Sequence, residues 1–135
     1  MTLENLVRIR ELQIEPPDKR ELHGLLSSAV ERLHDAENKH LSFSSRFDLA
    51  YSAAHGFALA ALRAAGYRSN KRYLVFQCLV HTTDIDRVKL RIFSICHERR
   101  NKAEYEGQLE IDETLLDELI AITKELSVIV NNIVC

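Results

Sequence analysis

Residues 96–107, with the sequence CHERRNKAEYEG, hold the side chains best suited to chemistry in this chain of 135 residues. Arg99 and Arg100 each offer a planar set of donors that suits a phosphate group. Asn101 and Tyr105 lie one turn apart on a helix, where they can orient a ligand or take part in proton transfer. The stretch therefore predicts a site for a phosphate-bearing partner.

A structural role for the same stretch stays open on the sequence alone. On a helical wheel Arg99 falls within the apolar stripe that contains Val88 and Ile92, where an unpaired charge would be costly. It can instead pair with an acid such as Asp48 or Glu113. In that alternative the arginines, the asparagine and the tyrosine form a clasp that holds the helices together.

A second polar edge is predicted on the preceding long helix, with i, i+3, i+4, i+7 spacing at Asp48, Tyr51, Ser52 and His55. A carboxylate and an imidazole on one helical face can serve in catalysis, or they can orient an arginine across the bundle. We treat Asp48 and His55 as supporting residues of the site. The alternative is an ordinary polar boundary with solvent.

Basic residues concentrate in the middle of the chain. Ten of the 18 fall between residues 63 and 102: Arg63, Arg68, Lys71, Arg72, Arg87, Lys89, Arg91, Arg99, Arg100 and Lys102. This window has a net charge of +7 and the rest of the chain one of −9, which indicates an anionic partner. Besides Arg99, the predicted phosphate- or nucleic-acid-binding residues are Arg68, Lys71, Arg72 and Lys102.

Other catalytic signatures are missing from the sequence. It contains no glycine-rich phosphate loop, no GxSxG and no HExxH, and none of its six histidines form an i,i+4 pair. We therefore expect no metal and no cofactor. Cys96 and His97 are a poor nucleophile pair, because adjacent helical residues point about 100° apart.

Composition and length fit a single globular domain. Apolar residues make up 46% of the chain and charged residues 28%, and no apolar run reaches the roughly 20 residues that cross a bilayer. The three cysteines, Cys78, Cys96 and Cys135, form no CxxC pair, which suits a reducing compartment. We expect a cytoplasmic protein without a membrane partner, with residues 1–17 as an arm or short helix and residues 18–135 as one bundle.

Helical spacing of apolar residues runs through nearly the whole chain. Asp18 can cap a first helix to about residue 40, and Ser42 or Ser44 a second that stops at Gly66. A shorter helix or a strand follows at residues 71–83. Two more long helices are expected, one behind a capping box of Thr83 and Asp86 and one opened by Asp112 or Thr114. The prediction is an all-α protein with an antiparallel bundle of four to five helices.

Two segments resemble the HEPN domain family, α-helical bundles common in prokaryotic toxin–antitoxin, defence and RNA-processing systems. They are RFDLAYSAAHGFALAALRAAGYR (residues 46–68) and RRNKAEYEG (residues 99–107). The resemblance covers roughly residues 18–131. It implies a HEPN-like bundle and, in catalytic members, a metal-independent endoribonuclease whose active site assembles across a homodimer.

The family signature is an arginine, usually followed by a polar residue, with a histidine several positions on. Arg100 and Asn101 match its first two positions, but Tyr105 stands five residues after Arg100 and no histidine follows His97. Tyrosine can donate a hydrogen bond to phosphate but does not replace imidazole at neutral pH. The resemblance thus implies phosphate binding more directly than it implies RNA cleavage.

Three functional hypotheses follow. The first is a homodimer that binds RNA or a nucleotide phosphate, with toxin-like endoribonuclease activity in which Arg100 stabilises the transition state and Tyr105 or a neighbour transfers a proton. The second is a non-catalytic interaction or antitoxin-partner module, with the Arg-Asn-Tyr cluster as a structural clasp. The third is a partner subunit for a nucleotidyltransferase.

Overall fold

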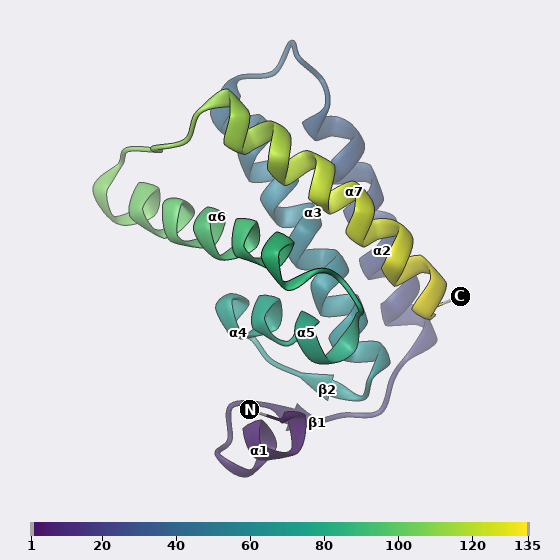
Figure 1. The fold of residues 1–135 in the computed structure, drawn as a ribbon. Coiled ribbons are helices and arrows are strands. Elements are labelled where there is room, and N and C mark those ends of the chain that lie inside the picture. Colours follow the sequence, from purple (N-terminus) through teal and green to yellow (C-terminus); the bar gives the residue numbers. More distant parts are fainter. Residues whose placement is uncertain (1, 135) are drawn as a thin grey trace.

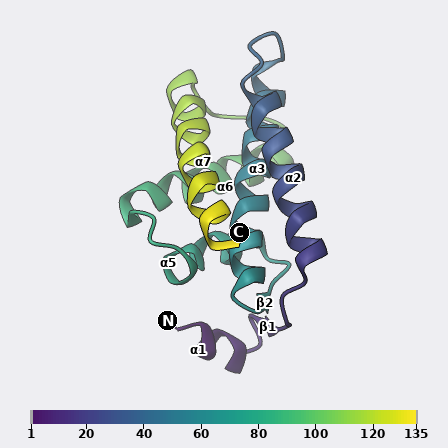
Figure 2. The ribbon, with the colours of Figure 1, turned by 90° about the vertical axis from the view of Figure 1, so that its right-hand side faces the viewer.

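The computed structural model describes residues 2–134 and is mostly helical, as the apolar spacing predicted. Its central element is α3 (Phe43–Ala64), and α2 (Lys19–Ala36) and α7 (Glu113–Val134) pack along it (Figures 1 and 2). Alanines on α3 are almost fully buried, which lets its neighbours approach closely. At Gly56 a Cβ atom would lie 3.1 Å from the Cβ of Ala29 on α2, so the close α2–α3 contact favours glycine there.

The ends of the long helices follow local capping rules. The Asp18 side chain accepts a hydrogen bond from the amide of Arg20 at the start of α2, and Ser42 accepts one from Ser45 at the start of α3. Gly66 follows α3 with a φ of +93°, a left-handed conformation that suits glycine. The predicted boundaries at these three positions are confirmed.

The remaining helices cover one side of α3. The segment that reads as either a helix or a strand forms α4 (Arg72–Gln77) and the single turn α5 (Leu79–Thr82). After it, α6 (Arg87–Glu106) crosses beside α4 before the chain returns into α7 (Figure 1). Because α6 occupies this crossing, α7 runs in the same direction as α3, whereas α2 runs antiparallel to it (Figures 1 and 2). The antiparallel order was therefore right for α2 and α3 but wrong for α3 and α7.

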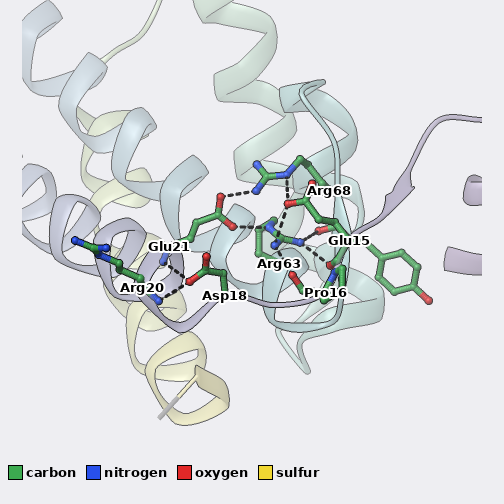
Figure 3. A network of polar contacts seen from close by, with 8 residues as sticks. Glu15, Pro16, Asp18, Arg20, Glu21, Arg63 and Arg68 are labelled. Carbon is green, nitrogen blue, oxygen red and sulfur yellow. Dashed lines mark hydrogen bonds and ion pairs between the residues drawn. The ribbon is translucent and has the colours of Figure 1, made fainter.

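The segment before α2 holds α1 (Leu3–Arg8) and β1 (Gln13–Ile14), which pairs antiparallel with β2 (Tyr67–Arg68). Beside this small sheet the guanidinium of Arg63, 1% exposed, donates to the backbone carbonyls of Glu15, Pro16 and Tyr67 (Figure 3). It also pairs with the carboxylates of Glu15 and Glu21, at 3.1 Å and 2.6 Å. Arg63 therefore ties the segment before α2 to the end of α3.

Two details of packing differ from the predicted ones. On α6 the buried residues are Phe93 and Cys96, and Val88 is 74% exposed, because Phe93 stacks on Phe76 of α4 with ring centroids 5.4 Å apart. The stripe predicted to enclose Arg99 is therefore rotated towards α4. The capping box does not form either, because Asp86 itself is the cap and accepts from the amide of Val88.

On α7 the buried positions include Leu116 and Ile120. They face the other helices of the same chain, so they are not free for a second subunit. Asp112 caps this helix by accepting from the amide of Leu115, as predicted. Within residues 2–134 no helix combines the length and the apolar character needed to cross a bilayer. Cys135 lies outside the described residues.

Candidate functional site

His97 lies at the centre of a polar cluster between α3 and α6. Its Nδ1 atom is 2.7 Å from the hydroxyl oxygen of Tyr51 on α3, and its Nε2 atom is 3.0 Å from the amide nitrogen of Asn101, one turn further along α6. An amide nitrogen only donates, so Nε2 of the neutral imidazole accepts from Asn101. The ring proton is then on Nδ1, which donates to the Tyr51 oxygen.

This arrangement leaves the hydroxyl hydrogen of Tyr51 unused by His97. Burial raises the pKa of Tyr51, so the phenol keeps its proton at neutral pH. Tyr51 can therefore donate a hydrogen bond to a ligand while it accepts one from His97. A phenol in this state is a donor for an anion and not a base.

Two arginines from different helices lie at the Tyr51 ring. The guanidinium carbon of Arg100 is 5.0 Å from the ring centroid, and that of Arg72, at the start of α4, is 6.0 Å from it. Arg100 makes a single long ion pair, at 3.7 Å, to Glu104. Arg72 forms no ion pair with any residue between 2 and 134. We call Tyr51, Arg72, His97, Arg100 and Asn101 the Tyr51 cluster.

The cluster keeps its imidazoles neutral. Burial lowers the pKa of His97, and the positive charges of Arg100 and Arg72 lower it further. The same three causes, with burial again the largest, bring the pKa of His55 to about 4, and His97 adds a smaller contribution. His55 lies one turn from Tyr51 on α3, with its ring edge-on to Phe76 at 5.9 Å. The positive charge at this site therefore belongs to the arginines.

Two small hollows flank the cluster. One, of about 200 Å³, is lined by residues that include Tyr51, Ser52, His55 and Arg72. The other, of about 250 Å³, is lined by residues that include Asp48 and Arg100. The predicted polar edge of α3 thus runs from one hollow to the other, with the Tyr51 cluster between them. Larger hollows elsewhere on the molecule do not contain these residues.

Four of the basic residues predicted to bind phosphate are engaged by other groups. Arg68 pairs with Glu15 and Glu21, and Lys71 pairs with Glu11. Arg99 donates to the backbone carbonyl of Glu110 at 2.5 Å, and Lys102 pairs with the Glu110 carboxylate at 3.0 Å. The other two, Arg72 and Arg100, lie in the Tyr51 cluster.

Of the predicted catalytic residues, Arg100 and Asn101 lie together in the cluster and Tyr105 does not. Tyr105 is 87% exposed near the end of α6. Cys96 is buried, and burial raises its pKa to about 12, so it supplies no thiolate at neutral pH. Proton transfer in this site would therefore fall to His97 or Tyr51.

Sequence reasoning missed the central position of His97. The signal for it was present, because His97 and Asn101 are four residues apart on one helix and therefore neighbours. Tyr51 was already part of the polar edge predicted on α3, but no local sequence pattern indicated that Tyr51 would contact α6. Tyr73, whose ring centroid is 5.5 Å from that of His97, had no signal of its own.

No protein-family model matches this sequence, and no curated protein or solved structure is significantly similar to it. The functional argument therefore rests on the geometry of the site.

Proposed function

We propose that this chain binds the phosphate of RNA or of a nucleotide at the Tyr51 cluster, as a HEPN-like homodimer in the cytoplasm. The observation that carries the proposal is the pair of guanidinium groups, Arg72 and Arg100, at the ring of a phenol whose hydroxyl can still donate. Two cations and a hydroxyl donor match the charge and the acceptor oxygens of a phosphate. The imidazoles of His55 and His97 are neutral, so the positive charge comes from the arginines.

RNA cleavage without a metal is the catalytic form of this proposal. The 2′-hydroxyl oxygen would attack phosphorus and the bond to the 5′ oxygen would break, with a base taking the first proton and an acid supplying the second. The arginines would stabilise the charge on the phosphoryl oxygens, and Tyr51 would be the donor. His97 is the nearby imidazole, but its Nε2 lone pair already accepts from Asn101. Binding therefore has stronger support than cleavage, which requires Asn101 to move.

Fluorescence anisotropy with labelled single-stranded RNA tests the binding. We expect Arg72→Ala and Arg100→Ala each to weaken binding at least about tenfold, as expected for a lost charge-assisted hydrogen bond. Arg91→Ala is the matched control, because Arg91 is exposed on α6 and lines a hollow that lacks the cluster. Equal affinity in all four proteins would exclude the cluster as the binding site. Cleavage of the same RNA in EDTA, abolished in Arg100→Ala, would establish the catalytic form.

A structural clasp is the second candidate, and the engagement of both His97 ring nitrogens favours it. His97 joins α3 to α6 through Tyr51 and Asn101 without any ligand. The chain would then be an interaction or antitoxin-partner module, with a nucleotidyltransferase as one type of partner. This candidate predicts that His97→Ala lowers the melting temperature and that the unaltered chain binds no RNA. A variant of unchanged stability that loses RNA would contradict it.

The dimer is tested separately by light scattering on the purified chain. A mass of two chains supports an active site assembled across a two-fold axis. Phe93 is 1% exposed within its own chain, so a dimer interface would use other residues. A mass of one chain at the concentrations used for binding would overturn the dimer and leave phosphate binding to be judged from the arginine variants.

A further inference from the structure

Tyr73 is an exposed aromatic ring at the edge of the Tyr51 cluster. It follows Arg72 on the first turn of α4 and is 47% exposed. Its covered part meets His97, with ring centroids 5.5 Å apart and planes tilted by 40°. The His97 ring in turn lies 6.2 Å from that of Tyr51. An aromatic surface open to solvent therefore lies next to the donors assigned to phosphate.

Tyr73 differs from the other exposed aromatic side chains in what surrounds its ring. Tyr105 is more exposed, at 87%, but among residues 2–134 no aromatic ring and no arginine stacks on it. Phe43 begins α3 and is 37% exposed. Among residues 2–134, Tyr73 alone combines an open ring with a neighbouring arginine that forms no ion pair to the described residues and with a partly buried polar cluster. Covering the exposed part of this side chain with a flat aromatic ligand would be favourable.

We propose that the site takes a single-stranded nucleotide unit, with its phosphate at Arg72 and Arg100 and its base stacked on Tyr73. The inference rests on the proposed phosphate binding and adds the recognition of an unpaired base. Bases have an aromatic face that tyrosine stacks on irrespective of sequence, and such stacking is worth about tenfold or more in affinity per base. In a duplex the bases are already paired and stacked on one another, so they are not free to stack on a protein ring.

Anisotropy with three labelled probes tests the inference on the full chain. The probes are a short single-stranded RNA, the same strand with abasic residues and the same strand annealed to its complement. We expect Tyr73→Leu to weaken binding of the intact strand roughly tenfold and to change that of the abasic strand little. Tyr73→Phe keeps the ring and retains the affinity. Tyr105→Leu is the control for the loss of an exposed tyrosine, and melting temperatures check that each variant folds.

The outcomes separate this inference from the proposal on which it rests. If Arg72→Ala no longer binds the intact strand while Tyr73→Leu binds it as tightly as the unaltered chain, the proposed phosphate binding is supported and the proposed base stacking is wrong. Binding of the duplex as tightly as the single strand would also overturn the inference. If no RNA binds and the arginine variants change nothing, both fail. A loss in Tyr73→Phe equal to that in Tyr73→Leu would show that the hydroxyl matters and the ring does not.

Discussion

At the scale of single residues, His55 links the site to the pH dependence of stability. Its pKa is lowered from 6.5 to about 4, mainly by burial and further by the positive charges of Arg72 and Arg100, with a smaller contribution from His97. The unfolded chain therefore takes up a proton as the pH falls below 6.5, whereas the folded chain resists it down to about pH 4. We expect stability to fall by about 1.4 kcal/mol per pH unit in this window from His55 alone.

Chemical denaturation at several pH values measures this slope. His55→Gln removes the titrating group, so the decline between pH 6.5 and pH 4 should become shallower by that amount. The control is His34→Gln, because the His34 side chain is 89% exposed. A slope equal in His55→Gln and in the unaltered chain would mean that His55 is open to water in solution.

Some residues of the site could be predicted from the sequence and others could not, and the difference has a physical cause. Arg100 and Asn101 could be singled out because their side chains are suited to phosphate and they follow one another in the sequence. Their proximity to Tyr51 depends on the packing of α6 against α3, and no local sequence pattern predicts that packing. The spacing of His97 and Asn101 was visible, but it gained meaning only when Tyr51 proved to lie at Nδ1.

At the scale of elements, Arg63 holds the segment before α2 against the end of α3. We expect Arg63→Ala to cost about 3 kcal/mol, because three backbone carbonyls lose their buried donor and the carboxylates of Glu15 and Glu21 keep only Arg68 as a partner. Arg68→Ala is the matched control. The Arg68 side chain pairs with the same two carboxylates, those of Glu15 and Glu21, but it is 32% exposed. Its loss should therefore cost about 1 kcal/mol or less. Urea denaturation measures both, and equal losses would contradict the role assigned to Arg63.

The same network should respond to acid. Hydrogen bonds from Arg68 and Arg63 lower the pKa of Glu21 below 4.5. Its contribution is therefore fully present above pH 4.5, where the unfolded carboxyl is also ionised, and is lost as the pH falls through the folded pKa. Glu21→Gln should flatten the stability curve below pH 4.5 and leave the window of His55 unchanged. Denaturation at pH 3, pH 4 and pH 6.5 distinguishes the two groups, because Glu21→Gln should change mainly the step from pH 4 to pH 3 and His55→Gln the step from pH 6.5 to pH 4.

Helix ends were more predictable than helix faces. Asp18, Ser42, Gly66 and Asp112 act through backbone groups within three residues of themselves, so the sequence alone contains the cause. The buried face of α6 depends on Phe76 of another helix, and for that reason the predicted stripe was rotated. The β1–β2 pair joins two-residue strands far apart in sequence and leaves no periodic pattern.

At the scale of the whole molecule, the excess of +7 in residues 63–102 overstates the charge offered to a partner. Arg63, Arg68, Lys71, Lys89 and Lys102 all pair with acids that lie outside this window. If all seven net charges met phosphates, the logarithm of the RNA affinity would fall with the logarithm of salt concentration with a slope near −5. Contacts from Arg72 and Arg100 alone give a slope of about −1.4.

Anisotropy titrations over a range of salt concentrations measure this slope directly. We expect a value near −1.4, reduced by about 0.7 in Arg72→Ala, because each phosphate contact on a single strand releases about 0.7 of a counterion. Lys71→Ala should leave the slope unchanged, because its ammonium already pairs with Glu11 at 2.5 Å. A slope near −5 would mean that RNA displaces the internal acids. The basic window would then act as one surface, and the site would extend well beyond the Tyr51 cluster.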